Sequence, residues 1–394
     1  MECYLDNSAT TRVSDDVAAL IADIMKKDFG NPSSKHMKGV ESDRLLRHAR
    51  ETFSSILKVN EKDIYFTSGG TESNNLAIIG SALANKRAGM HIITTQMEHA
   101  SVLEPMKYLK EQGFDITYLS VDGQGHIDLQ ELERAIRPDT ILVSVMYVNN
   151  EIGAVQDISS IGGLIKKKNP KTVFHCDAVQ AFGKYNIYPA KEKIDLLSIS
   201  GHKIHGPKGV GVLYINSGIK LRPLILGGGQ QRGMRSGTDN VPGACGMALA
   251  AQDAYDRLEE NNRHMAELKD HMTDALTELA DDLEHKDGNI KIRINSLKGM
   301  ESAPHIISCT FLPVKSEVLL HTLEERHIYV SSGSACSSHK RGGSDTLAAI
   351  GLTSGEADCT VRFSLCDEST IEEIDYCLDA LRKCIPHLAR FVSG

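Results

Sequence analysis

The residue with the clearest chemical capability is Lys203, in a glycine-rich turn directly after the apolar run 196–200. A lysine at the end of a strand can form a Schiff base with an aldehyde cofactor if its surroundings lower the pKa of the amine. Ser200 and His202 flank it and, with the N–H groups of nearby glycines, can hold a phosphate. This segment alone leaves a second interpretation open, in which Lys203 is a solvated surface lysine.

A second segment, 68–75, opens a helix directly after an apolar run and contains Gly70 and Thr71. The free N–H groups at the start of that helix, the helix dipole and the Thr71 hydroxyl make an anion site. The segment matches neither the Walker A loop nor the dinucleotide fingerprint. A simple helix N-terminus without a ligand remains the alternative.

Two more apolar runs end in polar side chains. Asp177 ends one of them, and a buried carboxylate there needs a cation such as a pyridinium nitrogen. Gln180, three residues later, is placed to bond the phenolic oxygen of the same ring. His99 follows another run, where an imidazole can stack on a flat ring and move protons. A salt bridge or helix cap for Asp177, and a structural role for His99, stay open.

The last third of the chain adds a thiol and a guanidinium. Segment 331–344 consists of small and polar residues, so we expect an exposed loop in which Lys340 and Arg341 favour the thiolate of Cys336. Arg362 lies within the apolar run 360–364, and an inward-pointing arginine calls for a carboxylate such as that of an amino-acid substrate.

Bulk properties narrow the class of protein. The chain has 394 residues, 24% of them charged, and a net charge of -8, so we expect neither a broad nucleic-acid footprint nor a membrane surface. Nine cysteines without a C-x-x-C pair indicate a reducing compartment. The later cysteines suit a core stripe better than a metal cluster, so no metal site is expected; they are Cys359, Cys366, Cys377 and Cys384. The N-terminus has no leader pattern and no run is long enough to span a bilayer, so we expect a cytoplasmic protein.

The order of elements indicates an α/β fold. Between residues 60 and 216, short apolar runs alternate with helical segments, which predicts a mostly parallel sheet covered by helices. Ligands of such sheets lie at the carboxyl ends of strands, where the candidate residues fall. The predicted strands are 63–67, 91–95, 115–119, 140–146, 172–176, 196–200 and 209–215. One long or broken helix over 242–280 then leads to a smaller α/β domain with strands 306–310 and 360–364 and helices 316–326 and 370–391, while helices 15–27 and 37–57 pack on one of the two domains.

Eight motifs together resemble the cysteine desulfurases of the NifS/IscS type, which are fold-type I, class V enzymes that use pyridoxal phosphate (PLP). The motifs run nearly from end to end in the family's order: YLDNSATT at 4–11, FGNPSS at 29–34, TSGGTE at 67–72, NNEIG at 149–153, SGHK at 200–203, RSGT at 235–238, SSGSAC at 331–336 and VRFS at 361–364. The resemblance implies a large PLP-binding domain over 13–258. A small domain over 1–12 and 259–394 would carry the catalytic cysteine loop.

The resemblance also implies roles for individual residues. Lys203 would carry PLP, Asp177 would pair with the pyridine nitrogen, Gln180 would bond the ring oxygen and His99 would stack on the ring. Asn150 and Arg362 would bind the substrate carboxylate, and Cys336 would accept the sulfur. The phosphate would be held by five residues, the last from the partner subunit: Gly70, Thr71, Ser200, His202 and Thr238.

The function implied by this resemblance is L-cysteine desulfuration by a homodimer. Cysteine sulfur would pass to Cys336 and onward to an acceptor, either an iron–sulfur scaffold or an enzyme of tRNA or thiamine thiolation. The polar segment after Cys336 and the chain end at Gly394 depart from the IscS pattern and leave the scaffold one acceptor among several. The alternatives are a selenocysteine lyase, another class V aminotransferase, and a non-catalytic sulfur-relay protein.

Overall fold

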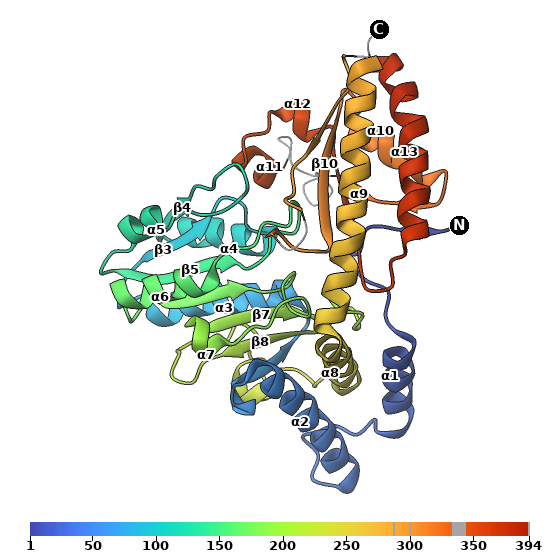
Figure 1. Ribbon diagram of the computed structural model, residues 1–394. Coiled ribbons are helices and arrows are strands. Elements are labelled where there is room, and N and C mark those ends of the chain that lie inside the picture. Colours follow the sequence, from blue (N-terminus) through green and yellow to red (C-terminus); the bar gives the residue numbers. More distant parts are fainter. Residues whose placement is uncertain (287, 299–300, 333–343, 393–394) are drawn as a thin grey trace.

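The computed structural model describes residues 1–286, 288–298, 301–332 and 344–392 (Figure 1). Its largest sheet has seven strands in the order β2-β8-β7-β6-β5-β3-β4. The strands are β2 (Ile64–Thr67), β3 (His91–Thr95), β4 (Asp115–Leu119), β5 (Thr140–Met146), β6 (Val173–Asp177), β7 (Leu196–Ser200) and β8 (Gly211–Ile215). All are parallel except β8, which pairs antiparallel with both neighbours. The predicted mostly parallel sheet is therefore confirmed, with β6 shifted by one residue so that it includes Asp177.

Apolar residues on both faces of this sheet explain why its strands read as continuous apolar runs. Neighbouring residues of a strand point to opposite faces, so Leu142 joins one core cluster and Val143 the other. One face is covered by α3 (Gly70–Asn85) and α4 (Ala100–Glu111). The other packs against α2 (Met37–Leu57), α6 (Ile158–Lys168) and α8 (Val241–Asp256). Two short helices, α5 (Leu129–Ala135) and α7 (Pro189–Glu192), and the 3-10 turns η1 (Glu61–Asp63), η2 (Gly201–Lys203) and η3 (Gln231–Gly233) complete these layers.

The N-terminal helices pack on the large-sheet side of the molecule. Both α1 (Asp15–Lys27) and α2 contact α8 (Figure 1). Ser14 caps α1 by accepting a hydrogen bond from the N–H of Val17. At Arg257 the backbone leaves helical geometry, and α9 (Leu258–Lys286) continues from there. The predicted long helix is therefore a broken one, whose two halves serve different layers.

A four-stranded antiparallel sheet forms the second layer system, in the order β12-β13-β10-β9. Its strands are β9 (Lys291–Ile294), β10 (Ile306–Leu312), β12 (Ser331–Ser332) and β13 (Thr360–Ser364). It packs against α9, α10 (Ser316–Glu324) and α13 (Ile371–Val392), with its own apolar core (Figure 1). The chain start belongs here, because β1 (Cys3–Tyr4) pairs with β11 (Ile328–Tyr329) in a separate two-stranded sheet whose Cys3 and Ile328 lie in this core. Two short helices, α11 (Asp345–Ala349) and α12 (Ser354–Ala357), bridge back towards the large sheet.

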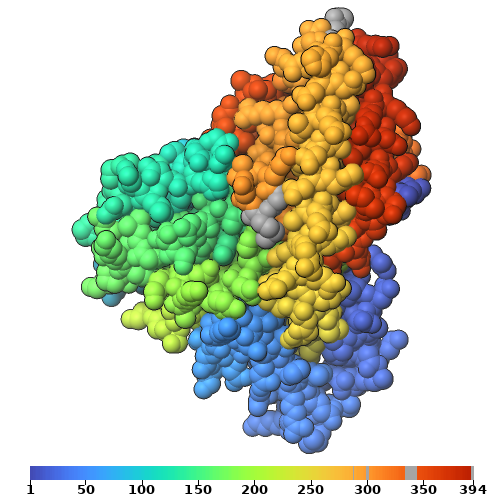
Figure 2. Space-filling view, viewed as in Figure 1, coloured from blue at the N-terminus to red at the C-terminus, as the bar shows by residue number. Residues whose placement is uncertain are grey.

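The two sheet systems are seated against each other, as Figure 2 shows for one face of the molecule. Ala303 and Ile306 reach into the core beneath the large sheet, so the predicted domain boundaries stay a prediction. Cys377 and Cys384 lie in the core stripe on α13 as predicted, whereas Cys366 is half-exposed in the loop that precedes this helix. No helix within the described ranges combines the length and apolarity needed to cross a membrane.

Candidate active site

A cavity of about 320 Å³ opens where the carboxyl ends of β5, β6 and β7 meet β13 of the second sheet. Parallel strands bring their carboxyl ends to one edge, which is why residues far apart in the chain meet there. Most predicted site residues line this cavity: Gly70, Thr71, His99, Asn150, Asp177, Gln180, Ser200, His202, Lys203 and Arg362. Residues that the motif analysis did not assign to the site also line it, among them Ser8, Ala9, Ser101 and Val179.

Lys203 reaches the cavity from the last residue of η2, directly after β7. Its Nζ donates hydrogen bonds to the backbone carbonyl oxygens of Ser8 and Ala9, the latter at 2.8 Å. These carbonyls belong to the N-terminal segment that enters from the second sheet. The amine is therefore held at the junction of the two sheet systems.

Asp177 is a buried carboxylate with neutral partners. Its Oδ2 accepts a hydrogen bond from Asn74 Nδ2 at 2.7 Å, and its Oδ1 accepts one from the N–H of Val179 at 3.0 Å. No ion pair to Asp177 occurs among the described residues. Because a buried carboxylate is costly without a cation, this position suits a cationic ligand group. Sequence reasoning missed Asn74, although its place four residues after Gly70 puts both residues on one helix face.

His99 is oriented by the first turn of α4, which it caps. Its Nδ1 accepts a hydrogen bond from the N–H of Ser101 at 3.1 Å, so the neutral ring carries its proton on Nε2. Burial lowers the pKa of His99, and the positive charge of Lys203 lowers it further, while Asp177 acts in the opposite direction. The ring is thus a neutral imidazole beside the cavity.

The start of α3 offers an anion cradle. Its N-cap, Gly69, makes no side-chain capping hydrogen bond and has a φ of 147°, a backbone angle that favours glycine. A Cβ on Gly70 would lie 2.8 Å from Val179, so only glycine keeps this wall open. Ser200 and His202 line the same cavity. Burial, and to a smaller extent the positive charge of Lys203, lowers the pKa of His202 to about 4.

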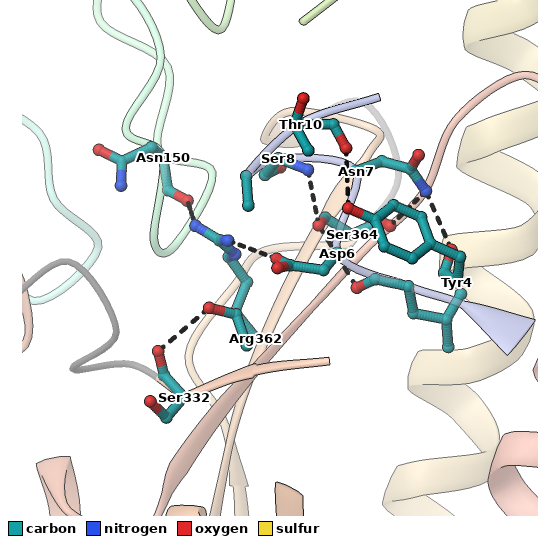
Figure 3. Close-up of polar contacts among 12 residues, drawn as sticks. Tyr4, Asp6, Asn7, Ser8, Thr10, Asn150, Ser332, Arg362 and Ser364 are labelled. Carbon is teal, nitrogen blue, oxygen red and sulfur yellow. Dashed lines mark hydrogen bonds and ion pairs between the residues drawn. The ribbon is translucent and has the colours of Figure 1, made fainter. Parts of the chain in front are cut away.

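Arg362 already has a carboxylate partner. Its Nη2 lies 2.7 Å from Asp6 Oδ1, and its Nη1 donates to the backbone carbonyl of Asn150 at 2.7 Å (Figure 3). The third nitrogen, Nε, is buried without a hydrogen-bond partner in the described part of the chain. The predicted inward-pointing arginine is confirmed, and the carboxylate that meets it in this structure is Asp6, which motif reasoning did not assign to Arg362.

The other predicted residues fall into two groups. Gln180 lines the cavity, where its Nε2 donates to the Ser8 carbonyl at 2.9 Å. Thr238 is exposed and lies off the cavity, in a loop tied to α3 by the two-point ion pair of Arg235 with Glu72. Its predicted role in the partner subunit stays a prediction.

Cys336 lies outside the described residues, but residues on either side of it approach the cavity. Ser331 of β12 is paired in register with Arg362. On the other side, the Ser344 hydroxyl caps α11 and donates to Glu151, the neighbour of Asn150. The described chain therefore leaves and re-enters beside the end of the cavity that Arg362 and Asn150 line.

The donor set fits PLP. The Lys203 amine suits an aldehyde. The Asp177 carboxylate, which has no cationic partner among the described residues, suits a pyridinium, and the start of α3 suits a phosphate. These groups line one continuous cavity, so a single ligand can meet all of them. Fold and site together define a fold-type I enzyme of the PLP-dependent class.

Comparison with known proteins gives the family. Residues 3–377 match the family model described as aminotransferase class-V. The cysteine desulfurase IscS of Methanosarcina thermophila is 41% identical over 98% of this chain and 92% of its own length, and that of Clostridium botulinum strain Hall is 40% identical over 98% and 94%. A solved NifS-like protein superposes with a TM-score of 0.91 at 38% identity, covering 98% of this chain and 100% of that one. The chain belongs to the class-V aminotransferases and, within them, to the NifS-like cysteine desulfurases.

Proposed function

We propose that this protein is an L-cysteine desulfurase, which moves the sulfur of L-cysteine to its own Cys336 and releases L-alanine. The observation that carries the proposal is that Lys203, Asp177 and Arg362 line one cavity. A solved protein titled SspA in complex with cysteine, 34% identical over 93% of this chain with a TM-score of 0.77, supports L-cysteine as the substrate.

PLP is the proposed cofactor, and bound at Lys203 it supplies an electron sink for bond cleavage in an amino acid. Asp177 would hold the pyridine N–H, and Gln180 the ring oxygen. The first N–H groups of α3 and the side chains of Thr71, Ser200 and His202 would hold the phosphate. His99 would lie against the ring. Each contact uses a donor or acceptor that already borders the cavity.

The chain's own groups then divide the chemistry. Arg362 and Asn150 orient the substrate carboxylate, and Lys203 Nζ takes the α-proton and later returns a proton to carbon. His99 holds a proton at Nε2 and exchanges it with the substrate thiol. Water exclusion by the buried strand ends strengthens these interactions.

Sulfur transfer is a displacement at sulfur. The Cys336 thiolate attacks the substrate sulfur, an S–S bond forms, and the C–S bond breaks with its electron pair staying on the carbon side. Protonation of that carbon gives alanine, and Cys336 is left as a persulfide. No outside oxidant or reductant is required.

The proposal extends to the assembly and the acceptor. We infer a homodimer in which Thr238 completes the partner's phosphate site, since Thr238 is exposed and off its own cavity while Leu226 and Phe29 expose large apolar surface. The persulfide would pass to an iron–sulfur scaffold or to an enzyme of tRNA or thiamine thiolation. Free thiols at all the described cysteines suit the reducing cytoplasm.

The test follows sulfur and alanine in three variants of the PLP-loaded protein. Cys336→Ser is expected to bind L-cysteine and release neither sulfide nor alanine at the wild-type rate, and Lys203→Ala is expected to lose the borohydride-fixed pyridoxal label from its peptide. Cys245→Ser is the matched control, because this thiol is buried in α8 and off the cavity. Full sulfide release by Cys336→Ser would instead favour direct elimination, as in a lyase.

A further inference from the structure

A histidine, a cysteine and an aspartate converge outside the cavity. The ligand atoms of His205, Cys366 and Asp367 all lie within 4.8 Å of one another. His205 comes two residues after Lys203, and the other two follow β13, the strand of Arg362. The cluster thus joins the two segments that wall the active-site cavity, without being part of it.

Each donor is held so that one atom faces the cluster. His205 Nδ1 lies 2.9 Å from the backbone carbonyl of Arg12, and since a carbonyl only accepts, Nδ1 carries a proton. Its Nε2 lies 2.9 Å from Asp367 Oδ1 and carries the proton that this carboxylate accepts, so a cation would replace that proton between the two atoms. Asp367 Oδ2 is occupied by Asn261 Nδ2 at 3.3 Å and by Arg257 at 3.5 Å.

This arrangement matches the supporting shell of metal ligands. Ligating histidines generally donate their other ring N–H to a carbonyl or carboxylate, and ligating carboxylates are hydrogen-bonded through their second oxygen. The Cys366 thiol lies 3.7 Å from Ser369 Oγ, a long hydrogen bond that a bound cation can replace. The Cys366 backbone is fixed beside the cluster, because its N–H donates to the same Ser369 Oγ at 3.0 Å.

Two hollows border the cluster. One, of about 70 Å³, is lined by His205, Cys366 and Asp367 together with Lys184 and Asp253. The other, of about 420 Å³, also includes His205 and Cys366 in its lining. Among the described cysteines, Cys366 is the one that is not buried. An entering cation can therefore keep a water as a further ligand.

We propose that His205 Nε2, Cys366 Sγ and Asp367 Oδ1 bind Zn²⁺, with water in the fourth position. One nitrogen, one sulfur and one oxygen ligand suit this borderline cation better than Mg²⁺ or Ca²⁺. Tetrahedral Zn²⁺ places its ligand atoms about 3.2–3.6 Å from one another, so shifts of about 1 Å in the side-chain atoms complete the site. Lys184 and Arg257 add positive charge nearby, and Asp253 and Glu368 on the same hollows offset it.

Occupation of this site would link the Lys203 turn to β13. The expectation from sequence was that the chain has no metal site, because Cys366 was grouped with the core stripe. The cluster forms only where the turn after Lys203 meets the loop after β13 in the folded chain.

Zinc content after equilibrium dialysis tests the site. The PLP-loaded protein is stripped with a chelator and dialysed against Zn²⁺, in a Cys336→Ala background that removes the proposed acceptor thiol. We expect one Zn²⁺ per chain. Cys366→Ser and Asp367→Asn should each weaken Zn²⁺ binding more than 100-fold. Loss of a residue that only hydrogen-bonds to a ligand typically costs ~10–100-fold, and Asn261→Ala is the variant that gives this comparison. Cys245→Ser, a buried thiol in α8, is the matched control.

A second measurement uses the wild-type holoenzyme and no substitution. Alkylation of Cys366 by iodoacetamide, followed by peptide mass spectrometry, should slow at least 10-fold with Zn²⁺ and stay unchanged with Mg²⁺. An unchanged alkylation rate with Zn²⁺, or undiminished zinc binding by Cys366→Ser, would overturn the proposal and leave His205 and Asp367 as a structural ion pair.

Discussion

Arg362→Gln is expected to weaken binding of L-cysteine and to leave binding of cysteamine unchanged. Cysteamine has the amine and the thiol of cysteine but lacks the carboxylate. Arg362 lines the cavity, and the contacts to Asn150 and Asp6 among the described residues use two of the five N–H groups of its guanidinium, so an entering carboxylate has further donors to meet. The comparison of two ligands separates that contact from any general damage to the site.

The structure sets the magnitude. A hydrogen bond between charged groups is worth about 1.5–3 kcal/mol, or roughly 10–150-fold in affinity. Asp6 already offsets part of the guanidinium charge at 2.7 Å, so we expect the lower half of that range, about 10–40-fold. The free energy of unfolding should fall by only about 1–2 kcal/mol, less than the 3–5 kcal/mol of a fully buried pair, because the Asp6 side chain is 21% exposed and can rehydrate.

The assay is a titration of each holoenzyme with both ligands, followed by the change in cofactor absorbance. Asp6→Asn should act in the opposite direction and tighten L-cysteine binding, because it removes the competing carboxylate. Arg50→Gln is the matched control, since Arg50 also has a buried, unpartnered Nε but lies over Phe66, away from the cavity. Equal weakening of both ligands by Arg362→Gln, or of neither, would refute the contact and leave Arg362 with a structural role in binding Asp6 and the Asn150 carbonyl.

Three further predictions follow from described contacts. Asp177→Asn should lower PLP affinity about 10–150-fold, measured by dialysis, because it removes the charge that faces the cavity; unchanged retention would assign Asp177 to structure alone. Lys269 is buried and, among the described residues, donates to the neutral acceptors Ser302 and Ala303, and burial lowers its pKa to about 8. The unfolded chain therefore binds more protons than the folded one between about pH 8 and 10.5, so the free energy of unfolding of the wild type should rise by roughly 3 kcal/mol over that window. Lys269→Met should lose this rise in urea unfolding at several pH values. The same slope of unfolding free energy against pH in both proteins would contradict the assignment. Finally, co-refolding Lys203→Ala with Thr238→Val chains should restore activity above that of either parent; activity no higher than the parents would place Thr238 in its own subunit's site.

Much of the fold was readable locally. All seven predicted strands of the large sheet occur, and the run at 140–146 matches β5 residue for residue, because a strand buried on both faces is apolar throughout. The two-residue strands β1, β11 and β12 were not predicted, because so short a segment shows no hydrophobic periodicity. Their existence depends on partners as distant as Ile328 is from Cys3.

The sequence by itself determined the candidate cavity, because residues that follow parallel strands must meet at one sheet edge. That rule brings Thr71, His99, Asp177 and Lys203 together without any knowledge of packing. Only the tertiary structure decided how the second sheet docks onto that edge. It pairs Arg362 with Asp6, 356 residues away, and it brings Cys366 to His205. Both contacts join segments that are far apart in the chain, and no local pattern encodes which distant segments become neighbours or how two layers pack.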